Sequence, residues 1–113
     1  MSSDKLIIHK GWFSKTCNYN YFKKNNLRPA SIIWLDCDIY SSAHEAFQLI
    51  QFILQDGTVL VIDDWFSNKG SPFHGVQKAF YEFSSSKEIK SQFIFTEYLS
   101  DSWKRKSFIT NKI

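Results

Sequence analysis

Residues 31–64 read SIIWLDCDIYSSAHEAFQLIQFILQDGTVLVIDD, and this stretch decides the fold of the 113-residue chain. It contains two short apolar runs, Ser31 to Leu35 and Thr58 to Ile62, and each run ends in acidic residues. Continuous apolar runs of this length, bounded by polar residues, are typical of strands that are buried on both faces of a parallel sheet. We therefore predict two neighbouring parallel strands.

The segment between the two runs has the pattern of an amphipathic helix. Ser42 and Glu45 match a capping box at its start, and Gly57 suits the turn that follows its end. A strand, a helix and a second strand of these lengths form a right-handed βαβ unit. The apolar residues of the helix recur at helical spacing and form one stripe: Ala43, Ala46, Phe47, Ile50, Ile53 and Leu54.

Four aspartates follow the two predicted strands. Asp36 and Asp38 follow the first strand, and Asp63 and Asp64 follow the second. Parallel strands bring their carboxyl ends to one edge of the sheet, where open α/β sheets bind ligands. Carboxylates gathered there repel one another unless a cation compensates, and oxygen ligands suit a hard cation such as magnesium. We predict a metal site, with separate solvation of the four side chains as the simpler alternative.

The composition restricts the class of protein. Hydrophobic residues make up 43% of the chain and charged residues 22%, which is typical of one globular domain, here residues 1–113. The net charge of +3, without a basic stripe among aromatic residues, argues against a nucleic-acid partner. We expect no membrane span and no signal peptide, hence a soluble cytoplasmic protein in which Cys17 and Cys37 are reduced.

The remaining segments extend the α/β pattern. Lys5 to His9 is a short strand candidate, and Gly75 to Phe83 has the apolar spacing of an amphipathic helix. Gln92 to Thr96 and Ser107 to Thr110 are predicted strands, antiparallel because their connection is too short for a crossover helix. The charge run Lys104 to Lys106 is interpreted as solvated protection of a sheet edge.

Four short motifs occur along the chain. An Asp-x-Asp-x-Tyr-x-Ser pattern covers Asp36 to Ser42, an Asp-Asp pair ends the next strand, and a Gly-Val-x-Lys-Ala helix start covers Gly75 to Ala79. A Gly-x-Phe-x-x-Thr segment covers residues 11–16. Together these motifs resemble the macrocin O-methyltransferase-like family of class I S-adenosylmethionine-dependent methyltransferases. The resemblance implies an α/β fold with a partial Rossmann-like class I methyltransferase sheet, whose parallel strands carry helices on their faces and whose carboxyl-terminal strand pair is antiparallel.

The resemblance also implies roles for the acidic residues. Asp36, Asp63 and Asp64 would ligate a magnesium ion that holds two neighbouring hydroxyls of a sugar or another small-molecule acceptor. Asp38 matches the position of the family's general base, which would take the proton of the reacting hydroxyl. S-adenosylmethionine would supply the methyl group in the full-length family.

The chain departs from the family at its amino-terminal end. In the family, two further strands and a glycine-rich loop that binds the cofactor precede the segment that matches Lys5 to His9. The four glycines of this chain form no such loop, since they stand at positions 11, 57, 70 and 75. We therefore expect a carboxyl-terminal fragment, a split-gene product or a degenerate copy that is inactive alone.

The expected absence of a neighbouring strand leaves the edge of Ser31 to Leu35 open. Natural proteins seldom leave an apolar strand edge bare. We expect Leu6 to Ile8 to lie beside Ile32 to Trp34; otherwise a separately encoded amino-terminal half or a second copy would cover this edge.

Three alternatives remain from the residues themselves. In a haloacid-dehalogenase-like phosphatase, Asp36 would be the nucleophile, Asp38 an acid, and Asp63 with Asp64 the magnesium pair. That class expects Thr or Val at the position of Tyr40. The metal-binding Asp-x-Asp of nucleotide-sugar glycosyltransferases is a second alternative, and a non-catalytic remnant that folds only with a partner is the third.

Overall fold

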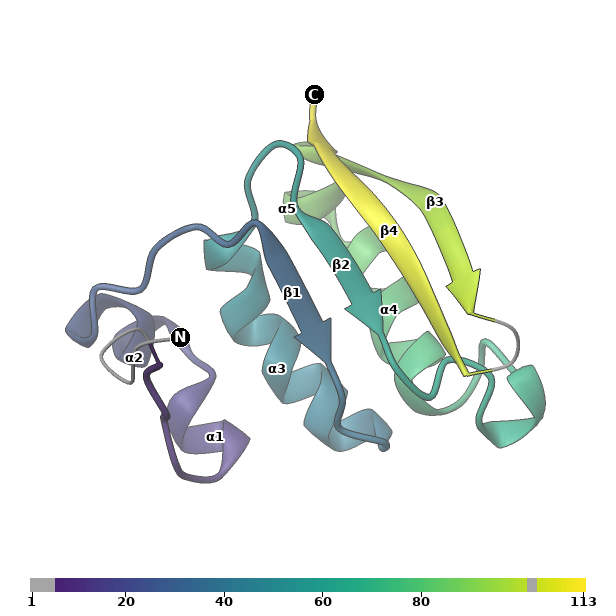
Figure 1. Ribbon diagram of the computed structural model, residues 1–113, viewed down its shortest axis with the longest axis horizontal. Helices are drawn as coiled ribbons and strands as arrows, with labels where there is room; N and C mark the ends of the chain where they lie inside the picture. The colour runs from purple at the N-terminus through teal and green to yellow at the C-terminus, as the bar shows by residue number, and fades with distance from the viewer. Residues whose placement is uncertain (1–5, 102–103) are drawn as a thin grey trace.

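The computed structural model describes residues 6–101 and 104–113, without the side chains of residues 100 and 101, and contains a four-stranded mixed sheet (Figure 1). The strand order is β1 (Ile32–Leu35), β2 (Val59–Ile62), β4 (Arg105–Lys112) and β3 (Phe93–Asp101). β1 and β2 are parallel, whereas β4 runs antiparallel to both of its neighbours. The predicted α/β class, the parallel pair and the antiparallel pair are confirmed.

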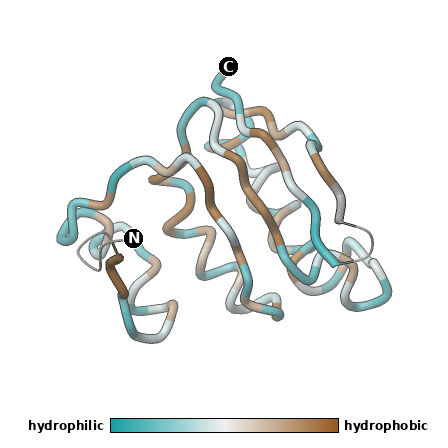
Figure 2. The backbone as a smooth tube through the Cα atoms, viewed as in Figure 1, coloured by the Kyte–Doolittle hydropathy of each residue, from teal (hydrophilic) through white to brown (hydrophobic). Residues whose placement is uncertain are grey.

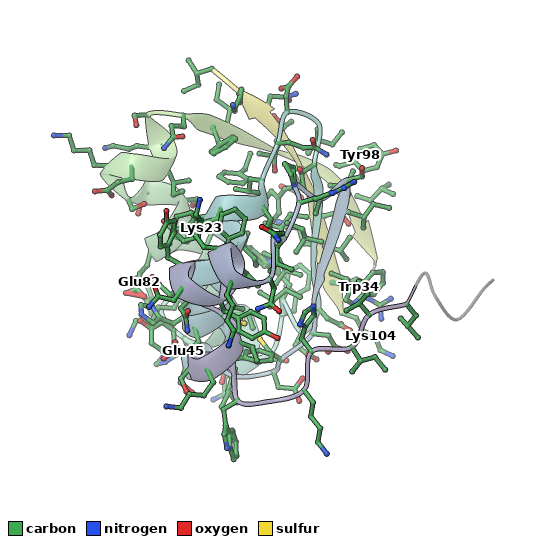
Figure 3. The ribbon with its side chains drawn as sticks, turned by 90° about the vertical axis from the view of Figure 1, so that its left-hand side faces the viewer. Lys23, Trp34, Glu45, Glu82, Tyr98 and Lys104 are labelled. Atoms are coloured by element: carbon green, nitrogen blue, oxygen red, sulfur yellow. The ribbon has the colours of Figure 1, made fainter. Side chains whose placement is uncertain are left out.

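Helices cover one face of this sheet in the described part of the chain. α3 (Tyr40–Ile53), α4 (Gly75–Ser85) and the short α5 (Lys87–Lys90) lie on that face, and Figure 3 shows Glu82 on the helix side, with Trp34 and Lys104 on the opposite side. The expected helices on both faces are therefore not found among these residues. Within residues 6–101 and 104–113, no helix has the length and apolarity needed to cross a membrane.

Two short helices precede the sheet and lie beyond β1 (Figure 1). They are α1 (Phe13–Thr16) and α2 (Tyr19–Lys24). The rings of Tyr19 and Phe22 contact the ring of Phe52 in α3, with centroid distances of 5.1 and 5.4 Å. This aromatic cluster attaches the amino-terminal part of the chain to α3 rather than to the sheet.

The core lies between the helices and β2, whose backbone follows hydrophobic positions along its length (Figure 2). Leu60 and Ile62 of β2 are completely buried. Phe80 of α4 stacks on Phe108 of β4 with centroids 4.5 Å apart. Each such buried side chain contributes about 2 kcal/mol of transfer free energy, so this packing holds α4 against the sheet.

The register of the parallel pair sets the position of the acidic residues. Leu35 is the partner of Ile62, and the amide of Asp63 donates to the carbonyl of Leu35 at 2.9 Å. β1 and β2 thus end level with each other, and Asp36 and Asp63 follow at the same edge of the sheet. The expectation that the acidic ends of the two strands meet is confirmed.

The strand predicted over Lys5 to His9 is wrong for its described part. Residues 6–10 have no regular secondary structure, and Leu6 to Ile8 are exposed. β1 is the outer strand of the sheet, so Leu6 to Ile8 do not form the strand expected beside Ile32 to Trp34. The physical reason is the tertiary context, which overrides the strand preference of Ile7 and Ile8: the next residue, His9, is hydrogen-bonded to Tyr21 of α2.

The capping box predicted for Ser42 and Glu45 is also wrong. α3 begins at Tyr40, its N-cap residue is Ile39, and no side chain caps it. The chain turns at Asp38, which has a positive φ of 67°, and the helix therefore starts before Ser42 is reached. Gly57, with φ +91°, lies in the turn before β2 as expected for a glycine.

The interpretation of Lys104 to Lys106 as a solvated edge is wrong for two of its residues. β4 lies inside the sheet, between β2 and β3, so its first residues face neighbours on both sides. Lys106 is 18% exposed and forms an ion pair of 3.1 Å with Glu97. Arg105 contacts Asp63 at 3.5 Å. Their charges are directed toward other side chains rather than toward bulk water.

We expect alternating amide protection along β1. Ser31 and Leu35 accept hydrogen bonds from β2 and its extension, so the intervening amides of Ile32 and Trp34 point to the outer edge of the sheet. Hydrogen exchange measured by NMR should find these two amides fast and the amide of Ile33 slow. Slow exchange at Ile32 and Trp34 would mean that another strand covers this edge in solution.

Candidate functional site

Three carboxylates meet at the carboxyl ends of β1 and β2. Asp36, Asp38 and Asp64 each offer an oxygen, and these oxygens all lie within 4.8 Å of one another. Asp38 and Asp64 have positive φ angles of 67° and 58°. This left-handed conformation is uncommon for a residue with a Cβ, although aspartate tolerates it better than most residues. Backbone strain of this kind is typical of functional sites.

The environment of Asp64 shifts its titration. The pKa of Asp64 is raised from 3.8 to about 6, first by a hydrogen bond with Asp38, then by burial and by the charges of the neighbouring aspartates. A proton shared between Asp64 and Asp38 therefore relieves the repulsion in the metal-free protein. A bound cation would relieve the same repulsion without the proton.

Cys37 lies between two of these residues and has a protonated thiol. Burial raises the pKa of Cys37 to about 11, and the charges of Asp38 and Asp36 add to this effect. A thiol with this pKa does not provide the thiolate that a metal ligand or a nucleophile requires. Both cysteines are free, in agreement with the expectation of reduced thiols.

Asp63 has a different environment from the other three aspartates. Its Oδ1 accepts the backbone amide of Asp64 at 2.9 Å and contacts Nε of Arg105 at 3.5 Å. The structure thus groups Asp36, Asp38 and Asp64, while Asp63 lies next to this group and is paired with a cation of the protein. The predicted metal ligands Asp36, Asp63 and Asp64 stay a prediction, and the geometry adds Asp38 to the possible set.

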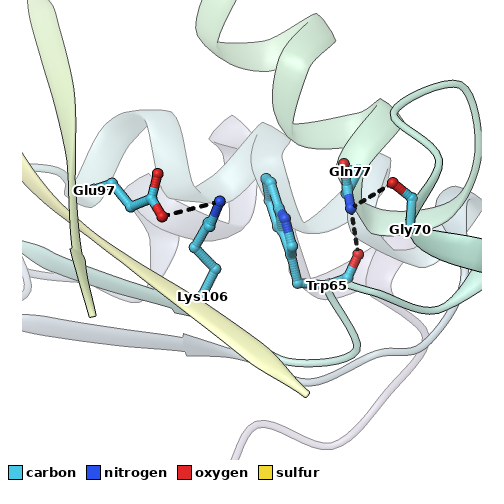
Figure 4. Close-up of polar contacts among 5 residues, drawn as sticks. All are labelled: Trp65, Gly70, Gln77, Glu97 and Lys106. Atoms are coloured by element: carbon cyan, nitrogen blue, oxygen red, sulfur yellow. Dashed lines mark hydrogen bonds and ion pairs between the residues drawn. The ribbon is translucent and has the colours of Figure 1, made fainter. Parts of the chain in front are cut away.

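Trp65 fixes the chain directly after Asp64. Its side chain is 2% exposed, and its backbone amide donates to the carbonyl of Lys104 at 2.9 Å. Its carbonyl accepts Nε2 of the buried Gln77 at 2.8 Å, and Gln77 also reaches the carbonyl of Gly70 (Figure 4). The loop with Asp64 is therefore held by the residue that precedes β4 and by α4. Sequence reasoning missed Gln77, although a polar residue next to the apolar stripe of α4 was a usable signal.

The tyrosine and lysine of the family motifs contact each other. Nζ of Lys78 lies 4.5 Å from the ring centroid of Tyr40, and the Tyr40 hydroxyl donates to Glu82. This hydrogen bond raises the pKa of Tyr40. Tyr40, Lys78 and Glu82 thus connect the start of α3, just after Asp38, to α4. The two sequence motifs are therefore in contact in the folded chain. Sequence reasoning did not predict this contact.

Gly75 of the same motif has a steric reason to be glycine. Its φ is +61°, and a Cβ at this position would lie 2.3 Å from Nδ2 of Asn68. A larger residue would displace the loop that connects Asp64 to α4. His74, which precedes it, is exposed.

A pocket of about 410 Å³ adjoins the carboxylate group. It lies between the end of β2 and the start of β4, and it contains both acidic and basic side chains. Its lining residues are Asp63, Asp64, Phe66, Ser67, Lys104 and Arg105. Sequence reasoning missed Lys104 and Arg105 as site residues, because only the antiparallel pairing of β4 with β2 brings them to this edge.

We expect the carboxyl group of Asp64 to titrate near pH 6 in the metal-free protein. The folded state then binds this proton more tightly than the unfolded state, so stability falls as pH rises from about 4 to about 6. Asp38→Asn removes the charge and the carboxylate partner and should lower the pKa of Asp64. Carbon-detected NMR titration checks both expectations, with Asp56→Asn as a control at the other end of β2. An ordinary pKa for Asp64 in the unmodified chain would contradict the shared proton.

The family comparison agrees with the motifs in the sequence. A model of the family Macrocin-O-methyltransferase (TylF) matches residues 1–105. No curated protein matches the chain. The family match includes the four aspartates and the segment around Gly75, and it favours a methyltransferase over a phosphatase or a glycosyltransferase. Methyltransferases of this kind generally take the methyl group from S-adenosylmethionine. With nearly all of its length matched, the chain belongs to the macrocin O-methyltransferase family.

Proposed function

We propose that this chain provides the metal and acceptor site of an O-methyltransferase that acts on a hydroxyl group of a sugar-like small molecule. The observation that supports this proposal best is the meeting of the Asp36, Asp38 and Asp64 oxygens within 4.8 Å at the carboxyl ends of parallel strands. Ligands of open α/β sheets bind at this edge. The class I methyltransferase sheet implied by the motifs is part of the proposal.

The donor set fits magnesium. Carboxylate oxygens are hard ligands, and magnesium is held by one or two carboxylates together with water or substrate oxygens. The raised pKa of Asp64 is further support, since uncompensated negative charge is what a divalent cation would neutralise. Asp36 and Asp64 belong both to the metal ligands predicted from the sequence and to the three carboxylates that meet in the structure. The third ligand is Asp38 or Asp63, and Arg105 already compensates the charge of Asp63.

Where Asp63 is the third ligand, Asp38 is available as the proposed general base. When bound, magnesium would lower the pKa of an acceptor hydroxyl, and S-adenosylmethionine would provide the methyl group. A carboxylate oxygen of Asp38 would accept the hydroxyl proton as the acceptor oxygen bonds to carbon. The hydrogen bond between Asp38 and Asp64 supports this role, because it places a proton acceptor inside the carboxylate group. Methyl transfer needs alignment of the reactants more than a covalent bond to the protein.

The residues of this chain fit a magnesium ion, but they do not fit S-adenosylmethionine. The four glycines stand at positions 11, 57, 70 and 75, so the 113 residues contain no glycine-rich loop of the kind that holds such cofactors. We assign no residue to the cofactor. A partner that carries a cofactor-binding half, or a second copy of this chain, is proposed to provide this site, and the outer edge of β1, which pairs with no other described strand, supports it.

Magnesium binding is expected to depend on the carboxylate group. Asp36→Asn and Asp64→Asn should each weaken binding by more than about tenfold, because each removes an anionic ligand. Isothermal titration calorimetry with magnesium chloride measures this effect. Asp38→Asn and Asp63→Asn then distinguish the two ligand sets: the larger loss identifies the third ligand. Asp56→Asn is the matched control. Asp56 lies in the turn before β2, and its carboxylate accepts the backbone amide of Lys112. Equal affinities in all five variants would refute the metal site.

The purified 113-residue chain is expected to transfer no methyl group by itself. The reason is the missing glycine-rich loop, which leaves the methyl donor without a binding site on these residues. Incubation with labelled S-adenosylmethionine, magnesium and a vicinal-diol sugar checks this expectation. Label transfer by the unmodified chain that Asp64→Asn abolishes would show the expectation to be wrong.

A further inference from the structure

Gln77 is a polar side chain that is buried where the segment after β2 meets α4. It is 5% exposed, and its Nε2 donates to the carbonyl of Trp65 at 2.8 Å and to the carbonyl of Gly70 at 3.3 Å (Figure 4). The nitrogen of a primary amide carries two protons, so these two acceptors use its full donor capacity. One side chain of α4 therefore fixes both ends of the segment 65–70.

The segment that Gln77 fixes contains a strained turn. Asn68, Lys69 and Gly70 follow one another with φ angles of 61°, 60° and 69°. In this left-handed conformation the Cβ of a residue lies too close to the following carbonyl oxygen, so a lysine adopts it only where the surrounding contacts outweigh the strain. The two hydrogen bonds from Gln77 are contacts of this kind, and without them the turn is free to relax.

The segment 65–70 is connected to Asp64 in two ways. Trp65, whose carbonyl accepts one of the two hydrogen bonds, follows Asp64 directly in the chain. The backbone amide of Ser67 donates to the carbonyl of Asp64 at 3.1 Å. A segment that is fixed against α4 therefore also fixes the backbone from which the Asp64 carboxylate projects.

We propose that Gln77 is a positioning residue, which holds Asp64 within the carboxylate group and so raises the affinity of this group for a divalent cation. The inference rests on the proposed function, because magnesium is the cation proposed for the group. The oxygens of Asp36, Asp38 and Asp64 already lie within 4.8 Å of one another. Magnesium demands near-ideal octahedral geometry with ligands at about 2.0–2.1 Å, so a small displacement of one carboxylate weakens binding. Loss of a group that orients metal ligands costs about 10–100-fold in metal affinity.

Gln77→Met tests this role, since it keeps the length of the side chain and removes both donors. It should weaken magnesium binding by about tenfold, as measured by isothermal titration calorimetry on the 113-residue chain. Thr58→Val is the matched control. Thr58 is completely buried, and its hydroxyl donates to the carbonyl of Ala30 at 2.7 Å, at the opposite end of β2 from Asp64. The control also loses a buried hydrogen bond to a backbone carbonyl, and it should lower the thermal unfolding midpoint without changing the magnesium affinity.

NMR provides two further measurements. In the absence of metal, the amide of Ser67 should exchange with solvent faster in Gln77→Met than in Thr58→Val, because the turn that joins it to Asp64 is released. The second measurement uses the unmodified chain and does not depend on the folding of a variant. The Nε2 protons of Gln77 should shift as magnesium chloride is added, with the same apparent affinity as the backbone amide of Asp64.

The outcomes separate this inference from the proposed function. Unchanged magnesium affinity in Gln77→Met overturns the positioning role, and so does an equal loss in Gln77→Met and Thr58→Val. If Gln77→Met does not fold, unshifted Nε2 protons at saturating magnesium overturn it. An unmodified chain that binds no magnesium refutes the proposed metal site, and exchange at Ser67 then decides alone. Faster exchange in Gln77→Met supports the positioning of Asp64, and equal exchange in the two variants overturns it.

Discussion

The parallel pairing of β1 with β2 is the constraint on which the rest of the structure depends. The two strands end level with each other, and the amide of Asp63 continues their ladder by donating to the carbonyl of Leu35. An antiparallel pair would have separated the acidic ends by the length of a strand. The crossover helix α3 therefore has two effects, since it covers the sheet and it makes the parallel direction possible.

Trp65 connects this constraint to the hydrophobic core. It follows Asp64 directly, and its ring packs among Phe80, Tyr81 and Phe108 with centroid distances of 5.5–5.7 Å. Its backbone is hydrogen-bonded on both sides, to Lys104 and to Gln77. Burial of one aromatic residue thus holds the position of a carboxylate that is itself only partly buried. The strained backbone at Asp64 persists because the residue after it cannot move.

Charge is distributed unevenly around this edge of the sheet. Three carboxylates share a small volume, and one consequence of their hydrogen bonding and mutual repulsion is the raised pKa of Asp64. The fourth, Asp63, has Arg105 beside it. Asp63 is therefore paired with a cation of the protein, whereas Asp64 shares a hydrogen bond with a second carboxylate, Asp38. This division is the physical basis for treating the group as a cation site.

The sequence by itself determined the βαβ unit, its direction and the acidic edge, because these follow from local apolar runs, helical periodicity and the rule for parallel crossovers. The family motifs around Asp36 and Gly75 could likewise be recognised without coordinates. Only the tertiary structure decided which carboxylates meet, since the directions of Asp38 and Asp63 depend on a positive φ and on a partner from β4. It also decided that Leu6 to Ile8 stay outside the sheet and that Arg105 and Lys106 are inside it. Contacts between residues far apart in the chain determine these features. The pattern of apolar residues along the sequence does not predict such contacts.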